Sequence, residues 1–151
     1  DLRSLKQRLA AHMPVTAAPP TDLPGPTGES NRHSMHPRGP ILCMGPGAKA
    51  AQDQLEVVKA LGGIGLSAEG DLDAATLQDL PHLAGVIWWG DANKGRAIET
   101  ALCKRDGPIT ALITGIPDAA HVLHERHVCI DTTAAGGNAA LLAEVAGPAL
   151  S

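Results

Sequence analysis

Ile41–Gly47, with the sequence ILCMGPG, is a short apolar run followed by a turn of two glycines and a proline. The apolar run is typical of a buried strand, and a helical pattern follows it from Ala48 to Leu61. Within that pattern Ala51, Leu55 and Val58 share one face. The stretch therefore predicts a strand, a tight turn and a helix, which together form the first unit of an α/β fold.

The same alternation continues to residue 131. The expected elements are, in order, a strand at Ile64–Ser67, a helix at Asp73–Leu80, a strand at Gly85–Trp89, a helix capped by Asp91 and running to about Arg105, a strand at Ile109–Thr114, a short helix at Asp118–Leu123 and a fifth strand at His127–Asp131. Parallel strands need helical crossovers of about this length between them. The sequence therefore predicts a Rossmann-like α/β fold, a parallel sheet with helices on both faces.

The N-terminal region has a different character. Leu2, Leu5 and Leu9 recur at helical spacing among lysine and arginine residues, which predicts a short amphipathic helix that ends before Pro14. Its apolar stripe suits either packing on another element or contact with a membrane surface. We favour packing, because three leucines make a narrow stripe.

Residues 14–40 are rich in proline and poor in apolar side chains. This composition predicts an extended arm that forms no core by itself. We therefore divide the chain into a helix and arm over residues 1–38, a Rossmann-like domain over residues 39–131 and a C-terminal packing motif over residues 132–151.

The composition excludes several classes of function. Trp88 and Trp89 are the only aromatic residues, and the formal net charge is −4, so the chain lacks the stacking platforms and basic surface that nucleic-acid binding requires. Three widely spaced cysteines without a CxxC pair fit a reduced cytoplasm better than a disulfide framework or a zinc knuckle. No apolar run approaches the roughly 20 residues that span a bilayer. The tryptophan pair ends a central strand, where either core packing or a ligand crevice is possible; we favour packing.

One motif resembles a dinucleotide site. Gly45, Gly47 and Ala50 satisfy the pattern G-x-G-x-x-A between a strand and a helix, where a pyrophosphate can approach the helix N-terminus. Pro46, however, removes a backbone N–H from the turn, and the next strand ends in Ala68–Asp71 rather than in a well-placed acid. We interpret the three residues as a decoy, so we expect no cofactor here. The alternative is a free-standing NAD(P)-binding Rossmann domain of an oxidoreductase.

Other reactive residues also fail to form a convincing site. Cys43, Cys103 and Cys129 lack a suitable base, and we expect each to act as a small buried apolar residue. A second group, comprising His121, His124, Glu125 and His127, has the order H-x-x-H-E, which matches neither common zinc pattern. We therefore expect no catalytic residue and no metal site.

Two stretches carry a family resemblance. Glu125–Leu142 (ERHVCIDTTAAGGNAALL) and Gly25–Asn31 (GPTGESN) lie near opposite ends of the chain. Both resemble segments of the proline utilization A family, whose members are bifunctional bacterial enzymes that oxidise proline to glutamate. The resemblance implies a parent with an FAD-dependent proline dehydrogenase and an NAD-dependent L-glutamate γ-semialdehyde dehydrogenase. This chain would be a fragment, namely the C-terminal domain that looks like a degenerate aldehyde dehydrogenase nucleotide-binding fold.

The C-terminal packing motif consists of small and polar residues. It consists of Thr132, Thr133, Ala135, Gly136, Gly137 and Asn138. Small side chains and glycines suit close packing against another domain, although an ordinary strand-to-helix turn would also fit. By resemblance, the motif lies over the aldehyde dehydrogenase module of the same polypeptide and helps close the substrate-channelling tunnel. The family often has Asn at the place of Asp131, and members can attach peripherally to the inner membrane.

Overall fold

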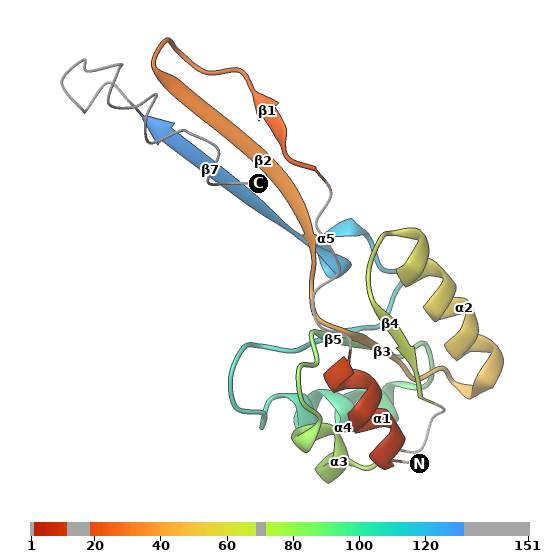
Figure 1. Cartoon of the computed structure of the whole chain (residues 1–151). Coiled ribbons are helices and arrows are strands. Elements are labelled where there is room, and N and C mark those ends of the chain that lie inside the picture. The colour runs from red at the N-terminus through yellow and green to blue at the C-terminus, as the bar shows by residue number, and fades with distance from the viewer. Residues whose placement is uncertain (1, 12–18, 69–71, 132–151) are drawn as a thin grey trace. The chain divides into compact units, whose positions relative to one another are not determined.

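The computed structural model describes residues 2–11, 19–68 and 72–131 (Figure 1). The chain divides into two compact units, each built from two separate segments. The α/β unit comprises residues 1–17 and 36–124, and the antiparallel unit comprises residues 18–35 and 125–151. The predicted packing motif at Thr132–Asn138 lies outside the described residues, as do Glu69, Gly70 and Asp71.

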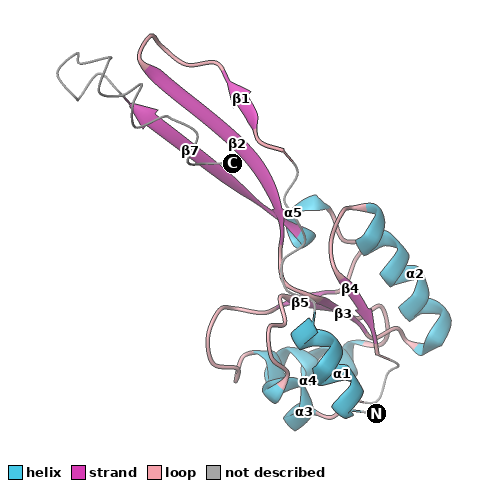
Figure 2. Ribbon diagram, viewed as in Figure 1, coloured by secondary structure: helices cyan, strands magenta, loops and turns pink. Residues whose placement is uncertain are grey.

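The α/β unit contains a four-stranded parallel sheet in the order β4-β3-β5-β6. Its strands are β3 (Ile41–Cys43), β4 (Gly65–Ser67), β5 (Gly85–Ile87) and β6 (Ala111–Ile113). Its helices are α1 (Leu2–Ala11), α2 (Gly47–Ala60), α3 (Ala74–Asp79), α4 (Ala92–Leu102) and α5 (Ala119–Val122) (Figure 2). This arrangement confirms the Rossmann-like α/β fold predicted from the alternation of strands and helices.

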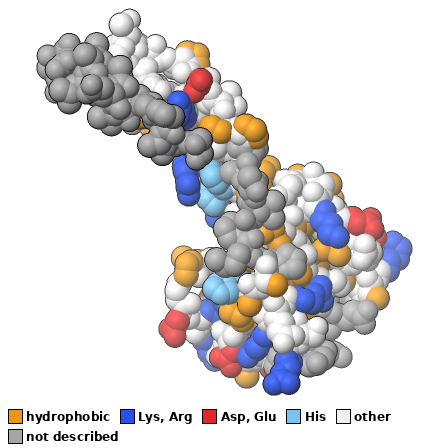
Figure 3. All heavy atoms as spheres, in the orientation of Figure 1, with side chains coloured by type: hydrophobic (Ala, Val, Ile, Leu, Met, Phe, Trp, Pro, Cys, Tyr) orange, Lys and Arg blue, Asp and Glu red, His pale blue; other side chains and the backbone are white. Residues whose placement is uncertain are grey.

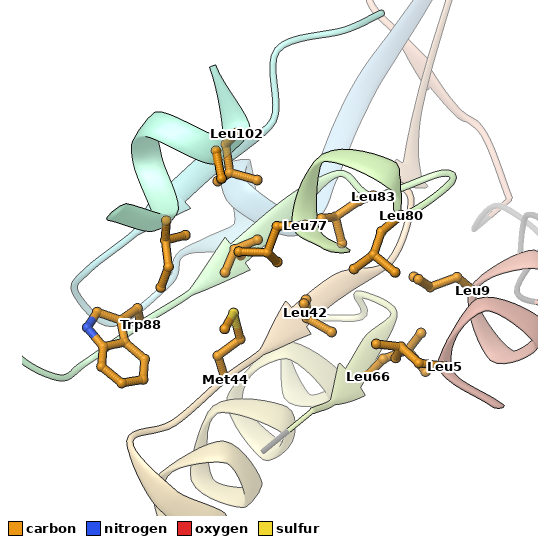
Figure 4. Close-up of a cluster of buried hydrophobic side chains, with 13 residues drawn as sticks. Leu5, Leu9, Leu42, Met44, Leu66, Leu77, Leu80, Leu83, Trp88 and Leu102 are labelled. Atoms are coloured by element: carbon orange, nitrogen blue, oxygen red, sulfur yellow. The ribbon is translucent and has the colours of Figure 1, made fainter. Parts of the chain in front are cut away.

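Each face of the parallel sheet has its own apolar cluster. Successive side chains of a strand point to opposite faces. Leu42, which pairs with Leu66 and Val86 on the neighbouring strands, therefore belongs to a cluster with α1, α3 and α4 (Figure 4). Cys43, which pairs with Ile87, belongs to a second cluster that includes residues of α2 and α5. Both faces of the sheet are thus covered by helices.

Helix α1 packs on the first of these clusters. Leu5 and Leu9 are only 6 % and 1 % exposed, whereas Arg3 and Arg8 on other faces of the helix are exposed. Leu5 and Leu9 therefore form a packing face, as we favoured from the spacing of the leucines. No helix in the described part of the chain has the length and apolar character needed to cross a membrane.

Aspartate side chains cap the N-termini of three helices. Asp73 accepts a hydrogen bond from the Thr76 N–H of α3 at 2.7 Å, and Asp91 accepts from two N–H groups of α4. Asp118 caps α5 and makes a capping box with His121. Such side chains satisfy N–H groups that have no partner within the helix. These caps explain why the predicted helix starts agree with the structure to within about a residue.

The antiparallel unit contains a three-stranded sheet in the order β1-β2-β7. Its strands are β1 (Thr21–Leu23), β2 (Glu29–Pro37) and β7 (Leu123–Asp131); the last two residues of β2 and the first two of β7 are counted with the α/β unit. The described part of the predicted arm, residues 19–40, is thus partly paired into a sheet. The limits that the sequence suggests for three domains stay a prediction.

The strand predicted at His127–Asp131 exists, but the prediction that it is the fifth strand of the parallel sheet was wrong. It forms the end of β7, which lies beside β2 in the other sheet. The reason lies in its sequence: the first half of β7 carries consecutive polar and charged residues from His124 to His127, whereas strands buried on both faces have continuous apolar runs. Every residue from Glu125 to Asp131 is exposed.

Candidate functional site

The turn after β3 is held in a conformation that requires glycine. Gly45 and Gly47 have φ values of +92° and +77°, in the left-handed region that residues with a Cβ rarely adopt. A Cβ on Gly45 would also lie 2.5 Å from the Gly47 backbone nitrogen. The two glycines of the G-x-G-x-x-A pattern are therefore explained by the shape of the turn itself.

A buried glutamine binds this turn from within. Gln54 of α2 is fully buried; its Oε1 accepts from the Gly45 N–H at 3.0 Å, and its Nε2 donates to the Gly45 carbonyl at 2.8 Å. The same carbonyl accepts the Trp89 N–H at 2.9 Å. The backbone polar groups of Gly45 thus bond to the chain itself.

The role of Gln54 was not predicted from the sequence. The available signal was its position, since Ala51, Gln54 and Val58 recur along one face of α2 and all three are buried. A polar residue among buried apolar positions needs hydrogen-bond partners nearby. The turn beside it supplies them. Ala50, the last residue of the pattern, is half-buried in the first turn of α2, and the helix cap Pro46 offers no side-chain hydrogen bond.

The two tryptophans fix loops at the same edge of the sheet. Trp88 is 7 % exposed, packs in the first apolar cluster and donates its Nε1–H to the Asp91 carbonyl at 3.0 Å. Trp89 packs against the second cluster and donates its Nε1–H to the Gly115 carbonyl at 2.8 Å. The packing interpretation of this pair is therefore confirmed for Trp88 and extends to Trp89.

The histidines of the H-x-x-H-E stretch have three different partners. The Nδ1 of His121 lies 2.7 Å from the Asp118 carboxylate, and this hydrogen bond is the main cause that lowers the Asp118 pKa. His124 stacks on His36 with ring centroids 5.6 Å apart. His127 lies 3.0 Å from Asn31. Among the residues described, no group of three or more potential ligands is arranged to hold a metal ion.

The three cysteines differ in exposure, which corrects the expectation that all are buried. Cys43 is buried, and burial raises the pKa of its thiol to about 12. Cys103 and Cys129 are exposed. The Cys129 thiol donates to the Glu29 carboxylate at 3.3 Å, and this bond is the first cause that raises its pKa. A raised pKa keeps Cys43 and Cys129 protonated, so neither is an activated nucleophile.

A polar network connects β2 to β7 in the antiparallel unit. Asn31 donates its Nδ2–H to Glu29 at 2.7 Å, and Glu29 also accepts from Cys129. The Asn31 oxygen lies 3.0 Å from His127 Nε2; because an amide oxygen only accepts, the histidine nitrogen is the donor. Asn31 is only 8 % exposed.

The turn before β2 completes this network. The Glu29 N–H donates to the Pro26 carbonyl at 3.0 Å, and Gly28 has a φ of +89° at the third position of the turn, where glycine is preferred. A Cβ on Gly25 would lie 2.6 Å from the Asn31 amide nitrogen. The structure thus brings together the two stretches of sequence, Gly25–Asn31 and the beginning of Glu125–Leu142, on which the family resemblance rests.

Comparison with known proteins identifies the same family. No family model matches the chain. Over 143 residues the chain is 31 % identical to the bifunctional protein PutA of Escherichia coli strain K12, a match that covers 80 % of this chain and 11 % of that protein. The bifunctional protein PutA of Rhizobium meliloti is 33 % identical over 150 residues, covering 81 % and 12 % of the two chains. The predicted resemblance to proline utilization A is confirmed.

The similarity to PutA concerns a small part of those proteins. The chain spans 11 % and 12 % of the length of these two curated relatives. A crystal structure of a Bradyrhizobium japonicum PutA mutant is 24 % identical with a TM-score of 0.44, and it matches 74 % of this chain and 14 % of the other. Activities of the whole PutA protein are therefore considered below as proposals.

Proposed function

We propose that this chain is a non-catalytic C-terminal module of a bifunctional PutA polypeptide that oxidises proline to glutamate. In this proposal FAD serves the proline dehydrogenase module and NAD serves the aldehyde dehydrogenase module, while the present chain binds neither. Its role is to dock on the aldehyde dehydrogenase module and help close the passage that carries the semialdehyde. The similarity to PutA over about four fifths of the chain supports this proposal.

The exposure of the antiparallel unit is the observation that carries the docking role. Among the described residues of β1, β2 and β7, Asn31 alone is buried. Apolar side chains remain exposed instead: Leu23 is 42 % exposed, and Val128 and Ile130 are each 45 % exposed. A three-stranded sheet that buries one polar side chain gains little hydrophobic stabilisation, so a further surface is needed to cover it.

The α/β unit also presents apolar side chains beside a strand. Strand β6 is at one end of the strand order β4-β3-β5-β6, and the loops on either side of it expose Ile109 and Ile116 by 99 % and 80 %. Figure 3 shows hydrophobic side chains reaching the surface in both units. Exposed apolar residues near an edge strand favour contact with another protein segment.

The motif Thr132, Thr133, Ala135, Gly136, Gly137 and Asn138 belongs to the same proposal. Its small residues would allow a close approach to the aldehyde dehydrogenase module. It follows β7 directly in the sequence, and β7 carries the exposed residues Val128 and Ile130. The role of these residues in closing the passage rests on the family resemblance.

The test uses the full-length PutA polypeptide that carries this segment. Val128→Asp combined with Ile130→Asp puts two carboxylates on one face of β7, because alternate residues of a strand share a face. We expect NADH formation from proline to acquire a lag while free semialdehyde accumulates. Proline oxidation measured with an artificial electron acceptor, and NADH formation from added semialdehyde, should keep their rates. Gly136→Val with Gly137→Val should give the same lag.

A matched control introduces the same charge elsewhere. Ala75→Asp with Ala92→Asp also adds two carboxylates, at exposed positions in the first turns of α3 and α4, where negative charge is tolerated. This variant should show no lag. Immediate NADH formation from proline in both the β7 variant and the glycine variant would refute the docking role.

The alternative, an NAD(P)-binding domain of an oxidoreductase, is favoured by one observation. The left-handed turn at Gly45 and Gly47 follows β3 and leads directly into α2, which is where a Rossmann domain holds a pyrophosphate. Calorimetric titration of the chain with NAD and NADP decides between the proposals. Micromolar binding that is lost on Gly47→Val would favour the alternative, whereas absence of heat would favour the docking module.

The cellular location is also a proposal. Its basis is the resemblance to PutA, which suggests a cytoplasmic polypeptide with peripheral attachment of the whole enzyme to the inner membrane. Flotation of the full-length polypeptide with liposomes, with and without Leu5→Ser and Leu9→Ser in α1, tests whether α1 takes part. Because both leucines pack in the α/β unit, we expect the intact helix to contribute nothing to flotation.

A further inference from the structure

A hollow lies at the edge of the α/β unit where the parallel strands begin. It has a volume of about 470 Å³, within the range of small-molecule sites, and it is on the opposite edge of the sheet from the Gly45 turn. The segments that precede β3, β5 and β6 form its walls, and His124 adds a ring. No residue of this hollow was singled out as a site from the sequence, apart from His124.

The walls of the hollow are fixed by hydrogen bonds. The Ala84 N–H donates to the Pro40 carbonyl at 2.9 Å, and a Cβ on Gly39 would lie 2.8 Å from the His82 carbonyl oxygen, so the first two segments touch. Thr110, which is 7 % exposed, donates to the Leu83 carbonyl at 3.3 Å and attaches the third segment. The hollow is therefore preorganised rather than formed by loose loops.

Arg105 places one cationic group in the wall. Its guanidinium donates to the carbonyls of Leu77, Gln78 and Leu80 at the end of α3, and its Nε donates to Thr110. All of these acceptors are neutral, so they satisfy hydrogen bonds without cancelling the charge. Burial lowers the pKa of Arg105, and the negative charge of Asp79 opposes that shift.

Arg38 places a second cationic group in the wall. Its Nε donates to the carbonyls of Ala120 and Leu123 at 3.0 Å each, and its backbone N–H donates to the Val122 carbonyl at 2.8 Å. These three contacts hold the arginine against the end of α5. Within the described part of the chain, neither Arg38 nor Arg105 is in an ion pair, and the two terminal nitrogens of Arg38 have no hydrogen-bond partner.

The charges that line the hollow do not balance. Arg38 and Arg105 contribute two positive charges, and Asp106 contributes one negative charge. His82 and His124 also line the hollow and add further positive charge when protonated. A guanidinium with free terminal N–H groups matches the geometry of a carboxylate or phosphate, to which it can donate two parallel hydrogen bonds.

We propose that this hollow binds a small oxyanion, either inorganic phosphate or a small carboxylate, through the terminal N–H groups of Arg38. Arg105 supplies a second positive charge, and His82 offers a further ring N–H donor. The site is independent of the docking role proposed above, because all of its lining residues belong to the α/β unit.

The test is a titration of the ¹⁵N-labelled chain with sodium phosphate and, separately, sodium acetate, at an ionic strength held constant with sodium chloride. We expect saturable shifts of the backbone N–H signals of Gly39, His82, Ala84 and Thr110. Phosphate alone saturating would identify the doubly charged anion as the preferred ligand, and saturation by both would support a general oxyanion site. Shifts that increase linearly with both salts, or that lie elsewhere, would overturn the proposal.

Two variants connect the binding to the named residues. Arg38→Gln should weaken binding roughly tenfold, because it removes the guanidinium and its positive charge. Arg96→Gln, an equal change at an exposed position of α4, should leave the affinity unchanged. His82→Asn should weaken binding by a smaller factor and is compatible with the φ of +55° at this position, since asparagine tolerates the left-handed region.

Arg38→Gln also removes a contact to the end of α5, so its spectrum must be compared with that of the unchanged chain. If this variant loses the fold, His82→Asn decides the matter. Unchanged affinity in His82→Asn, or in a folded Arg38→Gln, would overturn the proposed site.

Discussion

The α/β unit and the antiparallel unit obtain their stability in different ways. The α/β unit has an apolar cluster on each face of its sheet, including fully buried residues such as Leu42 and Ile87. The antiparallel unit is connected by polar contacts among Glu29, Asn31, His127 and Cys129. The first unit buries apolar side chains on both faces of its sheet, whereas the described strands of the second bury only Asn31. This difference is the physical basis of the docking role proposed above.

The largest effect should follow from removing an apolar side chain of the α/β unit. Leu42→Ala empties the centre of the parallel sheet and should lower the free energy of unfolding by about 2–5 kcal/mol. Val128→Ala on the exposed face of β7 should lower it by less than about 1 kcal/mol. Urea unfolding of both variants checks the comparison, and equal losses would mean that β7 is as well packed as β3.

A smaller loss should follow from removing the buried amide of the α/β unit. Gln54→Leu leaves the polar groups of Gly45 without their side-chain partner and should cost about 1–3 kcal/mol. The neighbouring exposed residue provides the control, since Gln52→Leu should change stability by about 0.5 kcal/mol or less. Thermal or urea unfolding would measure both. If the two variants are equally stable, the amide contributes nothing to holding the turn.

The thiols can report on the two units separately. At pH 8 the exposed Cys103 should react quickly with a disulfide reagent, Cys129 more slowly and Cys43 only on unfolding, because burial raises the Cys43 pKa to about 12. Glu29→Gln removes the charged acceptor that raises the Cys129 pKa, so Cys129 should react a few times faster. Mass spectrometry of the modified peptides assigns each rate. A slower Cys129 in Glu29→Gln would contradict the electrostatic explanation.

The smallest effect concerns acid stability of the α/β unit. Hydrogen bonding to Thr76 lowers the pKa of Asp73. A group with a lowered pKa contributes stability above its unfolded pKa, and the contribution is lost as the pH falls through the folded value. Asp73→Asn keeps a capping oxygen without this titration, so the variant should lose less stability between pH 5 and pH 3, a window of about two units around the ordinary pKa. Identical pH profiles of the two proteins in urea unfolding would exclude Asp73 as a contributor.

Local signals explain which parts of the fold were predictable. The run Ile41–Met44 and the aspartates at 73, 91 and 118 mark strands and helix starts through contacts only a few residues apart. The partner of β7 could not be predicted in this way, because a strand that is exposed on both faces specifies its pairing only weakly. Ile109 was expected to begin a strand, yet it is 99 % exposed, since it follows Pro108 in the loop before the edge strand β6.

The candidate sites were predictable to different degrees. The shape of the turn at Gly45 could be anticipated from its glycines, but its contact with Gln54 depends on how α2 packs against the sheet. The hollow around Arg38 and Arg105 unites segments that are far apart in the chain, and neither arginine belongs to a recognisable motif. Whether an arginine has an ion-pair partner can be determined only after the fold is known.

The connection between Arg38 and Val122 has a consequence for the order of folding. Their backbones are joined by a hydrogen bond, so the α/β unit brings its own two boundaries together. Asn31 and His127, which are 96 positions apart, would otherwise have to close a very long loop before they could pair. During synthesis, β2 leaves the ribosome long before β7 exists. We therefore expect β2 and β7 to pair last, after the intervening unit has supplied most of the required proximity.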